Sequence, residues 1–321
     1  MIISIGIRIF NYHTMTHHLK KFNFSLVFIF IPIICYAQAE TVFNNIHFEE
    51  SLETVQEKIK EISEATRTIS IDTPIFPLAK NKEDHLVGTN VTVAGGTITK
   101  VVFTFADDKL TYIESRGKAV ESLIETRKDT ARAYLGYKVY FSDRVFAHVE
   151  KDAVWMLTEA ATHPNLFTWE NPYLTSENSD PVSYEISAKI PDFIEMGGNI
   201  DALAPNFETE STLINTEELD GSDPNAQIQI NCFGIEYAGF PRKMEARFGN
   251  NKLNVVWILT GKGEEERIRQ KLIAEYGAPI FKNDDWEIYN DWQIGHRLDK
   301  PEVLLLTKEL GQFYKKEYFK Q

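Results

Sequence analysis

Apolar and polar positions alternate in two stretches of the chain that resemble each other closely. The first is AGGTITKVVFTFADDKL at 94–110, and the second is AGFPRKMEARFGNNKL at 238–253. An Asp-Asp or Asn-Asn pair lies where each stretch must reverse, and both residue types tolerate the left-handed conformation of a tight turn. The pattern predicts two β-hairpins. Their inward-facing rows are predicted to be Val101, Phe103 and Phe105 in the first hairpin, and Met244, Ala246 and Phe248 in the second.

A helix is predicted upstream of each hairpin. The first begins after Ser51, a favourable N-cap residue, and its apolar residues recur at helical spacing. Its counterpart covers Asn199 to Phe207 and contains Pro205, which removes a backbone donor inside the pattern. We therefore expect a short or broken helix there. The stripe of the first helix is Leu52, Val55, Ile59 and Ile62.

Downstream of the second hairpin the pattern predicts a helix, a strand and a final helix. Three glutamates, 264–266, would lie at the positive start of the first of these helices, and Gly277 would end it. A continuous apolar run from Glu302 to Thr307 is typical of a strand that is covered on both faces. The final helix is predicted over Glu309 to Phe319. The stripe of the helix before Gly277 is Ile268, Leu272, Ile273 and Tyr276.

The order of these elements repeats along the chain. Residues 105–110 match 248–253 at a shift of 143, and 137–158 match 286–307 at a shift of 149 without a gap. Further upstream, Phe48 and Val55 fall on Phe193 and Ile200 at a shift of 145. We interpret this as a tandem duplication. The sequence therefore predicts an α+β fold of two tandem repeats, each a helix followed by an antiparallel sheet with an inserted helix.

An apolar stretch near the N-terminus, residues 22–36, predicts export. Two lysines precede it, and small residues, Ala37 and Ala39, follow it at the positions of a cleavage site. The stretch is about 15 residues long and contains Pro32, whereas a spanning helix needs roughly 20 residues. Residues 1–39 are therefore predicted to be a signal peptide that is cleaved after Ala39 or after Ala37.

The leader leaves two alternatives open. Met15 begins a segment that makes a better signal-peptide start, in which case residues 1–14 lie upstream of the true start. A lipidated cysteine would need small residues before it, but Cys35 follows Pro-Ile-Ile, which disfavours lipidation. Without the leader Cys232 is the single cysteine. No intramolecular disulfide can then form, so stability must come from the cores, in which Cys232 is expected to be a small buried residue.

The charge of the chain excludes some classes of partner. The full sequence has a formal net charge of −13. The leader contains three basic residues and no acidic one, so 34 basic residues less these three stand against 47 acidic residues, giving −16. This charge argues against nucleic acid and anionic membrane surfaces as partners. No second apolar run approaches spanning length, so no membrane span is predicted in the mature chain.

We expect residues 40–165 to form repeat domain one, 166–185 a linker and 186–321 repeat domain two. Proline, asparagine and serine are frequent between the repeats, as is typical of a linker. The linker also contains apolar residues that a free linker would not need. They would either pack between the domains or form an exposed contact patch. These residues are Phe167, Trp169, Tyr173 and Leu174.

Known catalytic and metal-binding motifs are largely missing. The sequence contains no G-x-S-x-G, H-E-x-x-H, Walker loop or C-x-x-C. Ser115 and Lys118 have S-x-x-K spacing, but its usual companions S-D-N and K-T-G are missing. The acidic turn at 218–225 does not match a calcium loop. Five histidines follow the leader, and no two lie within five residues of each other, so we predict no metal, no cofactor and no catalytic residue.

The outward rows of the predicted sheets carry the remaining candidates. Strand parity places Arg144, Phe146, His148 and Glu150 opposite Val145 and its neighbours, and Gln293, Arg297 and Asp299 face the corresponding way in the second copy. These rows are either ordinary solvated sheet faces or a binding surface, since a cationic strip is unusual in so acidic a chain. The candidate binding residues are Arg144, His148, Lys243, Glu245, Arg247 and Arg297, together with Trp169 and Tyr173 of the linker.

A signal peptide followed by units of helix, hairpin and further strands resembles the tandem repeats of β-lactamase-inhibitor-like proteins. It is similar also to small envelope proteins of the outer-membrane assembly family. The residues that carry the resemblance are 105–110 and 248–253, in the pattern F-x-[DN]-[DN]-K-L. The chain lacks the disulfides of the former and the lipidated cysteine of the latter. The resemblance implies binding through an exposed sheet face, with no catalytic residues to carry over.

Taken together, the sequence predicts a periplasmic or secreted, non-enzymatic binding protein. It would recognise a protein or envelope component through its sheet faces and the groove between its repeats. The alternative is an envelope hydrolase with a dispersed active site. That interpretation requires His148, Arg297 and a carboxylate in one pocket, with a strongly shifted pKa. A purely structural envelope protein is the third interpretation.

Overall fold

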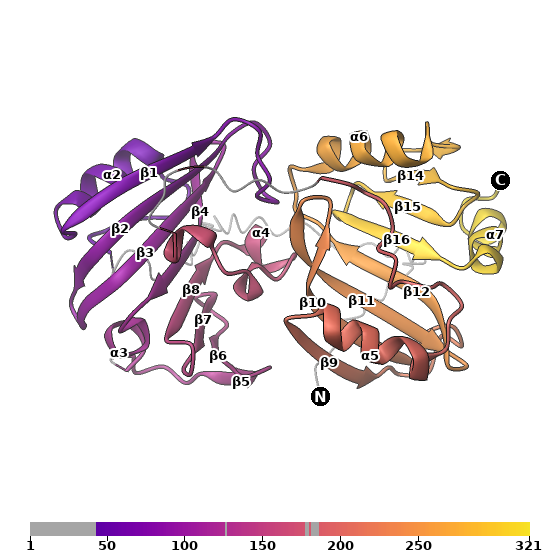
Figure 1. Cartoon of the computed structure of the whole chain (residues 1–321), viewed down its shortest axis with the longest axis horizontal. Coiled ribbons are helices and arrows are strands. Elements are labelled where there is room, and N and C mark those ends of the chain that lie inside the picture. The colour runs from indigo at the N-terminus through magenta and orange to yellow at the C-terminus, as the bar shows by residue number, and fades with distance from the viewer. Residues whose placement is uncertain (1–42, 126, 177–179, 181–185) are drawn as a thin grey trace, which may run out of the picture. The chain divides into compact units, whose positions relative to one another are not determined.

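The computed structural model describes residues 43–125, 127–176, 180 and 186–321, which belong to one compact unit spanning Cys35–Gln321. The predicted signal peptide, its cleavage sites and the alternative start lie outside these residues. Two eight-stranded antiparallel sheets follow one another along the described chain (Figure 1). The predicted α+β fold of two repeats, each with a helix before its sheet, is confirmed.

Repeat one begins with helix α2 (Leu52–Lys60), and its strands lie in the order β1-β2-β3-β4-β8-β7-β6-β5. A short helix, α3 (Ala119–Leu123), is inserted after β4, and α4 (Glu159–Thr162) follows β8. The strands are β1 (Ala65–Ile71), β2 (Glu83–Val93), β3 (Gly96–Ala106), β4 (Lys109–Arg116), β5 (Arg132–Tyr134), β6 (Tyr137–Tyr140), β7 (Val145–His148) and β8 (Ala153–Leu157).

Repeat two has the same topology. Its strand order, β9-β10-β11-β12-β16-β15-β14-β13, matches that of repeat one strand for strand. Helix α5 (Ile200–Glu210) precedes the sheet, α6 (Glu265–Tyr276) is inserted after β12, and α7 (Lys308–Glu317) follows β16. The strands are β9 (Leu213–Glu218), β10 (Ile228–Tyr237), β11 (Phe240–Gly249), β12 (Lys252–Leu259), β13 (Phe281–Lys282), β14 (Trp286–Tyr289), β15 (Ile294–Arg297) and β16 (Glu302–Leu306).

The shift of 149 residues holds for the last three strands of each repeat. β6, β7 and β8 begin 149 residues before β14, β15 and β16. The shift continues into the helix that follows, because Thr158 and Thr307 are both N-caps. The hydroxyl of each accepts a 3.3 Å hydrogen bond from the backbone N–H three residues later. The structural repeat thus includes a helix start as well as the strand positions.

The two hairpins match in their turns and in an irregularity after them. Asp107 and Asp108 have φ of 50° and 62°, and Asn250 and Asn251 have φ of 52° and 60°. Both are two-residue turns with left-handed backbone, as predicted. The register then shifts by one residue at the same place in each hairpin, between Thr104 and Phe105 in one and at the equivalent position in the other. Such a bulge is a local feature that a duplication would copy.

The predicted shift of 145 residues for the first helix is wrong. Ser51 and Asn199 are the N-caps of α2 and α5, so the helices correspond at a shift of 148. Pro205 does not shorten α5, which runs for 11 residues against 9 in α2. Pro205 lies on the exposed side of α5. The carbonyl oxygen of Asp201 that loses its intrahelical donor there can therefore bond to water.

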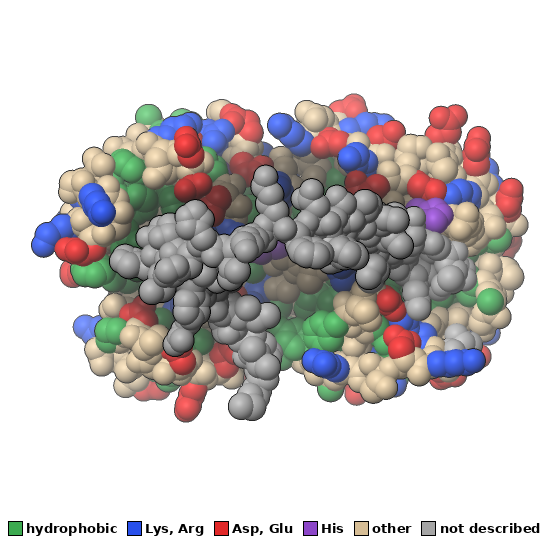
Figure 2. All heavy atoms as spheres, turned by 180° about the vertical axis from the view of Figure 1, so that it is seen from behind, with side chains coloured by type: hydrophobic (Ala, Val, Ile, Leu, Met, Phe, Trp, Pro, Cys, Tyr) green, Lys and Arg blue, Asp and Glu red, His purple; other side chains and the backbone are tan. Residues whose placement is uncertain are grey.

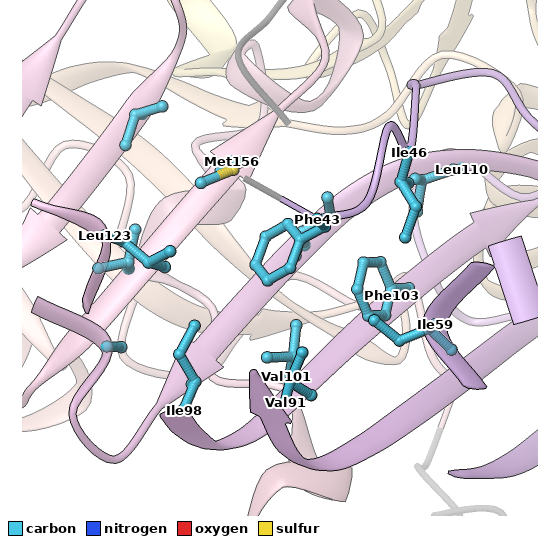
Figure 3. Packing of buried hydrophobic residues seen from close by; sticks show 14 of the residues in the cluster. Phe43, Ile46, Ile59, Val91, Ile98, Val101, Phe103, Leu110, Leu123 and Met156 are labelled. Atoms are coloured by element: carbon cyan, nitrogen blue, oxygen red, sulfur yellow. The ribbon is translucent and has the colours of Figure 1, made fainter. Parts of the chain in front are cut away.

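Each sheet covers a core on one face, and the helix before the sheet packs on that core. Val55 and Ile59 of α2 are fully buried, and the rings of Phe43 and Phe103 meet edge to face at 5.4 Å between centroids (Figure 3). Burying one such side chain contributes about 1.5–3 kcal/mol. In repeat two, Leu203 and Phe207 of α5 are in the equivalent place. Every residue of the two predicted inward rows is buried.

The inserted helices differ most between the repeats. α3 has 5 residues, whereas α6 has 12 and ends at Gly277, with φ of 79°, as predicted. Ile268 and Leu272 of α6 are buried in the core of repeat two. Glu264, expected at the start of this helix as a favourable charge, instead has its carboxylate buried between two arginines. The start of α6 is therefore held by ion pairs.

The C-terminal elements follow the prediction with a small change in bounds. All five residues of β16 are buried, as expected for a strand covered on both faces. α7 begins one residue and ends two residues before the predicted limits, and of its apolar side chains Leu310, Phe313, Tyr314 and Tyr318 only Leu310 is buried. Phe313 and Tyr318 are 52% and 66% exposed. Within the part of the chain that the structure describes, no helix is long and apolar enough to cross a membrane.

Candidate functional site

The outward face of the repeat-one sheet is not a polar surface. Phe146, expected there between Arg144 and His148, stacks on Phe167 with 4.3 Å between ring centroids. Trp155 and Tyr112 are buried on the same side. The chain that follows α4 lies over them as two short 3₁₀ helices, η1 (Leu166–Thr168) and η2 (Pro172–Leu174). We call residues 166–176 the inter-repeat segment. It gives the repeat-one sheet a second apolar layer.

Trp169 and Tyr173 belong to this layer. The interpretation of the linker aromatic residues as an exposed contact patch is therefore wrong, because both rings are packed. They are 6% and 2% exposed. The carbonyl oxygen of Trp169 accepts hydrogen bonds from the side chains of Tyr112 and Trp155, at 3.1 and 3.2 Å. The ring centroids of Tyr173 and His85 are 4.7 Å apart. The packed interpretation holds because the apolar side of the sheet is large enough to cover both rings.

A buried polar network fixes the inter-repeat segment to the sheet. The backbone N–H of Asn171 donates to Glu114 at 2.8 Å, and its amide nitrogen donates to His85 and Thr104 at 3.1 Å each. Burial raises the pKa of Glu114, although Arg116 beside it favours the carboxylate. Burial opposes ionisation of Glu83 as well. There, however, the hydrogen bond from His85 and two backbone N–H groups outweigh burial and lower the pKa.

Thr104, His85 and Glu83 form a hydroxyl, imidazole and carboxylate series. His85 Nδ1 lies 3.0 Å from the Thr104 hydroxyl, and Nε2 lies 2.6 Å from Glu83. Since Asn171 donates to Nδ1, the ring donates its proton from Nε2 to Glu83. Glu83 is 2% exposed and the other two side chains are fully buried, so no substrate can reach the hydroxyl. The series is suited to holding the inter-repeat segment in place.

Two other candidate nucleophiles are also buried. Ser115, of the S-x-x-K spacing, is 1% exposed within β4. Cys232 is fully buried in β10, as predicted, and burial raises the pKa of its thiol to about 11. A thiol with so high a pKa is a poor nucleophile at neutral pH. No group of three or more potential metal ligands occurs among the described residues.

Arg144 and His148 lie at the two ends of β7. Arg144 is in the turn before the strand with φ of 53°, and its side chain is partly buried. His148 packs edge to face on Tyr137 at 5.2 Å, and its Nδ1 accepts from the backbone N–H of Lys151 at 3.4 Å. His148 and Arg297 are the last residues of equivalent strands in separate sheets. This places them apart, whereas the hydrolase interpretation needs them together.

The basic residues of the repeat-two sheet face are neutralised by neighbours. Lys243 and Arg247 contact the two carboxylate oxygens of Glu245 at 2.7 and 2.8 Å. Burial alone would raise the pKa of Glu245, but the charge of Lys243 outweighs burial and the pKa is lowered. Arg297 pairs with Asp299 at 2.8 Å. On the face shown in Figure 2, basic and acidic side chains are interspersed. The expected cationic strip is therefore a row of ion pairs.

A cleft of about 440 Å³ opens between the repeats. Lys151 and Glu170 form an ion pair of 2.8 Å at this cleft, and the hydrogen bond from Lys151 lowers the pKa of Glu170. Burial and the nearby Glu170 raise the pKa of Tyr137 to about 12. We call this the inter-repeat cleft. It is lined by Tyr137, Lys151, Thr168, Trp169 and Glu170 on one side and by Thr212, Leu213, Gly234 and Pro241 on the other.

The repeat-two wall of the cleft is shaped by a bulge in β10. Pairing with β11 shifts between Phe233 and Ile235, and Gly234 between them has φ of 86°. Phe233 pairs with Leu213 on one side and with Lys243 on the other. In repeat one, burial raises the pKa of Tyr134, and the charges of Glu217 and Glu245 of repeat two raise it further. Lys243 and Glu245 thus lie near this boundary between the repeats.

The two repeats are also joined by a partly buried contact around loop 74–79 of repeat one. Arg267 of α6 donates to the carbonyl oxygens of Pro74 and Ile75 at 2.6 and 3.1 Å. Arg267 also pairs with Glu264, which is bound on its other side by the fully buried guanidinium of Arg242. Contacts that orient two repeats before any ligand arrives lower the entropic cost of binding between them.

Sequence reasoning did not identify Tyr137, Lys151 or Gly234 as site residues. Lys151 lies within the segment 137–158 that matches 286–307, where Lys300 of repeat two occupies the same place. No local pattern marks a cleft whose walls come from segments about 40 to 100 residues apart. The one available signal was the excess of aromatic residues in the linker, which indicated an inter-repeat layer. Comparison of the chain with models of protein families, with curated proteins and with solved structures found no match.

Proposed function

We propose that this protein is an exported binding protein that holds part of a protein partner or envelope component in the inter-repeat cleft. The observation that carries the proposal is the cleft itself, where two aromatic rings, a lysine–glutamate pair and the bulge of β10 meet. Ligand sites in proteins are usually concave, of some 300–1,000 Å³, and combine apolar walls with a few placed polar groups. The inter-repeat cleft has this composition and size.

The chemistry of the cleft favours a neutral or mixed-charge segment. Tyr137 and Trp169 provide ring surface, and the opposite charges of Lys151 and Glu170 attract neither sign strongly. The partly buried Arg267 contact supports a preformed site, since it joins the two repeats that provide the walls. The burial of Thr104, His85 and Glu83 supports binding in preference to hydrolysis. Export rests on the predicted signal peptide, and sheet-face binding on the resemblance to inhibitor-like repeats.

Site-specific cross-linking tests this proposal. A photoreactive p-benzoylphenylalanine is placed at Lys151, in the cleft, or at Lys60, at the exposed end of α2. After irradiation in an envelope extract, we expect a discrete adduct from position 151 and not from position 60. A second change, Thr212→Trp, fills the cleft from the repeat-two side and should abolish the adduct. Thr216→Trp, at an exposed position on β9 four residues further along the chain, is the matched control and should retain it.

Circular dichroism first establishes that all variants are folded. Equal adducts from positions 151 and 60, or an adduct at 151 that survives Thr212→Trp, would show that the cleft is not the binding site. Mass spectrometry of the adduct identifies the partner.

A further inference from the structure

The repeats differ in the ion pairing of one lysine that both contain. Lys109 and Lys252 occupy the same place after the two hairpin turns. In repeat one Lys109 pairs with Glu49 at 3.4 Å. The position equivalent to Glu49 is Gly197, because the backbone N–H of Glu49 donates to Leu110 at 2.9 Å and that of Gly197 donates to Leu253 at 2.7 Å. Repeat two therefore has the lysine without its carboxylate partner.

The backbone at these two positions is the same. Glu49 has φ of 70° and Gly197 has φ of 84°, so both are left-handed. A Cβ added to Gly197 would have no atom within 4 Å. Neither backbone conformation nor space excludes a glutamate at position 197. The glycine leaves the ammonium of Lys252 open to the outside, and within the described residues no ion pair involves it.

Lys252 lines a hollow of about 520 Å³ at the start of α7. Glu309 also lines the hollow, and it too has no ion pair among the residues that the structure describes. The ring of Phe313 is 52% exposed there, while Leu310 is buried. The hollow thus contains one unpaired charge of each sign beside an exposed ring. It is lined by Gly197, Asn225, Lys252, Asn254, Thr307, Glu309, Leu310 and Phe313.

Some polar groups of the hollow already form hydrogen bonds within the protein. The amide nitrogen of Asn254 donates to the carbonyl oxygens of Asn225 and Gly249, at 3.3 and 3.1 Å, so its own side-chain oxygen remains an acceptor. The hydroxyl oxygen of Thr307 accepts from the N–H of Leu310, and its proton remains to be donated. Available to a ligand are therefore donors at Lys252 and Thr307 and acceptors at Asn254 and Glu309.

We propose that this hollow binds a small zwitterion with an apolar group, such as an aliphatic or aromatic amino acid. The carboxylate of the ligand pairs with Lys252 and accepts from Thr307. Its ammonium group lies between Glu309 and the side-chain oxygen of Asn254. Its apolar group packs on Phe313. This site is separate from the inter-repeat cleft and does not depend on the function proposed for it.

Repeat one cannot form the same site. Glu49 already neutralises Lys109, and the helix equivalent to α7 is α4, with only 4 residues. At the shift of 149, the residue in the place of Phe313 is Pro164, which provides no aromatic wall. The comparison between the repeats therefore predicts binding of one ligand per chain.

Isothermal titration of the full chain with L-phenylalanine and L-leucine tests the proposal. Gly197→Glu restores the carboxylate of repeat one next to Lys252, and we expect it to weaken binding at least tenfold. Gly221→Glu is the matched control and should bind as the wild type does. Gly221 also has φ of 74° and no atom within 4 Å of an added Cβ. Lys252→Gln provides an independent loss of binding if Gly197→Glu does not fold.

Single-charge probes separate the two halves of the site. 3-Phenylpropionate lacks the ammonium group and phenethylamine lacks the carboxylate, so each should bind at least tenfold more weakly than L-phenylalanine. Equal binding of either probe would overturn the assignment of a zwitterion. No saturable binding of either amino acid, or binding unchanged by both Gly197→Glu and Lys252→Gln, would overturn the site.

Discussion

Arg267 of repeat two donates a 2.6 Å hydrogen bond to the carbonyl oxygen of Pro74 in repeat one, across 193 positions of the sequence. The same guanidinium pairs with Glu264, and through it with the buried Arg242. A charged group that joins two folded repeats in this way has a structural consequence. It couples the stability of one repeat to that of the other.

Replacing Arg267→Ala should destabilise both repeats together. The change removes the side-chain donor of four backbone carbonyl oxygens in loop 74–79 and one partner of the buried Glu264. Such losses cost about 2–4 kcal/mol. We expect one cooperative urea transition, shifted to lower midpoint, by circular dichroism and tryptophan fluorescence. Lys262→Ala, at an exposed position near the start of α6, is the control. Two separate transitions in the wild type would contradict coupling through Arg267.

Asn171→Ala should loosen the inter-repeat segment. The variant leaves His85 and Thr104 without the donor that each now receives at 3.1 Å, and Tyr173 without the acceptor of its N–H. We expect a loss of about 1–3 kcal/mol in the free energy of unfolding. A red shift of tryptophan emission should accompany it, as Trp169 becomes accessible to water. Asn165→Ala, at the start of η1, tests whether the effect is specific to the buried network. Unchanged emission in Asn171→Ala would argue against it.

Pro205→Ala should stabilise repeat two. Alanine restores the backbone donor for the carbonyl oxygen of Asp201 inside α5, and the side chain is exposed, so packing does not change. Helix propensity favours alanine by about 3 kcal/mol, and the greater freedom of the unfolded chain offsets about 1 kcal/mol of this. We expect a net gain of roughly 1–2 kcal/mol, measured as a higher urea midpoint. A lower midpoint would show that the proline is needed for the path of α5.

Acid should destabilise repeat two through His296. Burial lowers the pKa of this imidazole to about 4, even though Glu287 beside it favours the charged form. The unfolded chain takes up the proton near pH 6.5 and the folded chain only near pH 4. The contribution of the neutral His296 to the free energy of unfolding is therefore fully present above pH 6.5. It is lost as the pH falls towards 4, and the loss amounts to about 2–3 kcal/mol. Urea unfolding at pH 7, 5.5 and 4.5 measures this loss.

His296→Gln should make the free energy of unfolding nearly independent of pH between pH 6.5 and 4, because glutamine takes up no proton. Below that range a second loss should remain in both proteins. Hydrogen bonds from Arg269 and Lys282 outweigh burial and lower the pKa of Glu287 to about 2, so the stability it adds disappears between about pH 4.5 and 2. If the free energy of unfolding falls equally steeply with pH above pH 4 in wild type and His296→Gln, His296 is not the cause of the acid destabilisation.

The sequence by itself determined the repeated architecture. Hairpin rows, turn residues and helix caps depend on neighbours within a few positions, so period and turn chemistry specified them before any tertiary contact. Val101, Phe103 and Phe105 are buried because alternation places them on one face, and Asp107 and Asp108 reverse the chain because both accept left-handed backbone. Even Pro205 was located correctly on its helix. Its effect was overestimated, since solvent exposure of that helix side is not a local property.

Only the tertiary structure decided which polar and aromatic residues are accessible. Trp169 lies in a linker by composition, yet its ring is covered because the second face of the repeat-one sheet is apolar. Lys243 and Arg247 have the sequence pattern of a cationic row, but Glu245 between them neutralises both. The cleft at Tyr137 and Gly234 and the hollow at Lys252 are made from segments that are distant along the chain. Which segments meet is determined by long-range packing, for which a single local pattern contains no information.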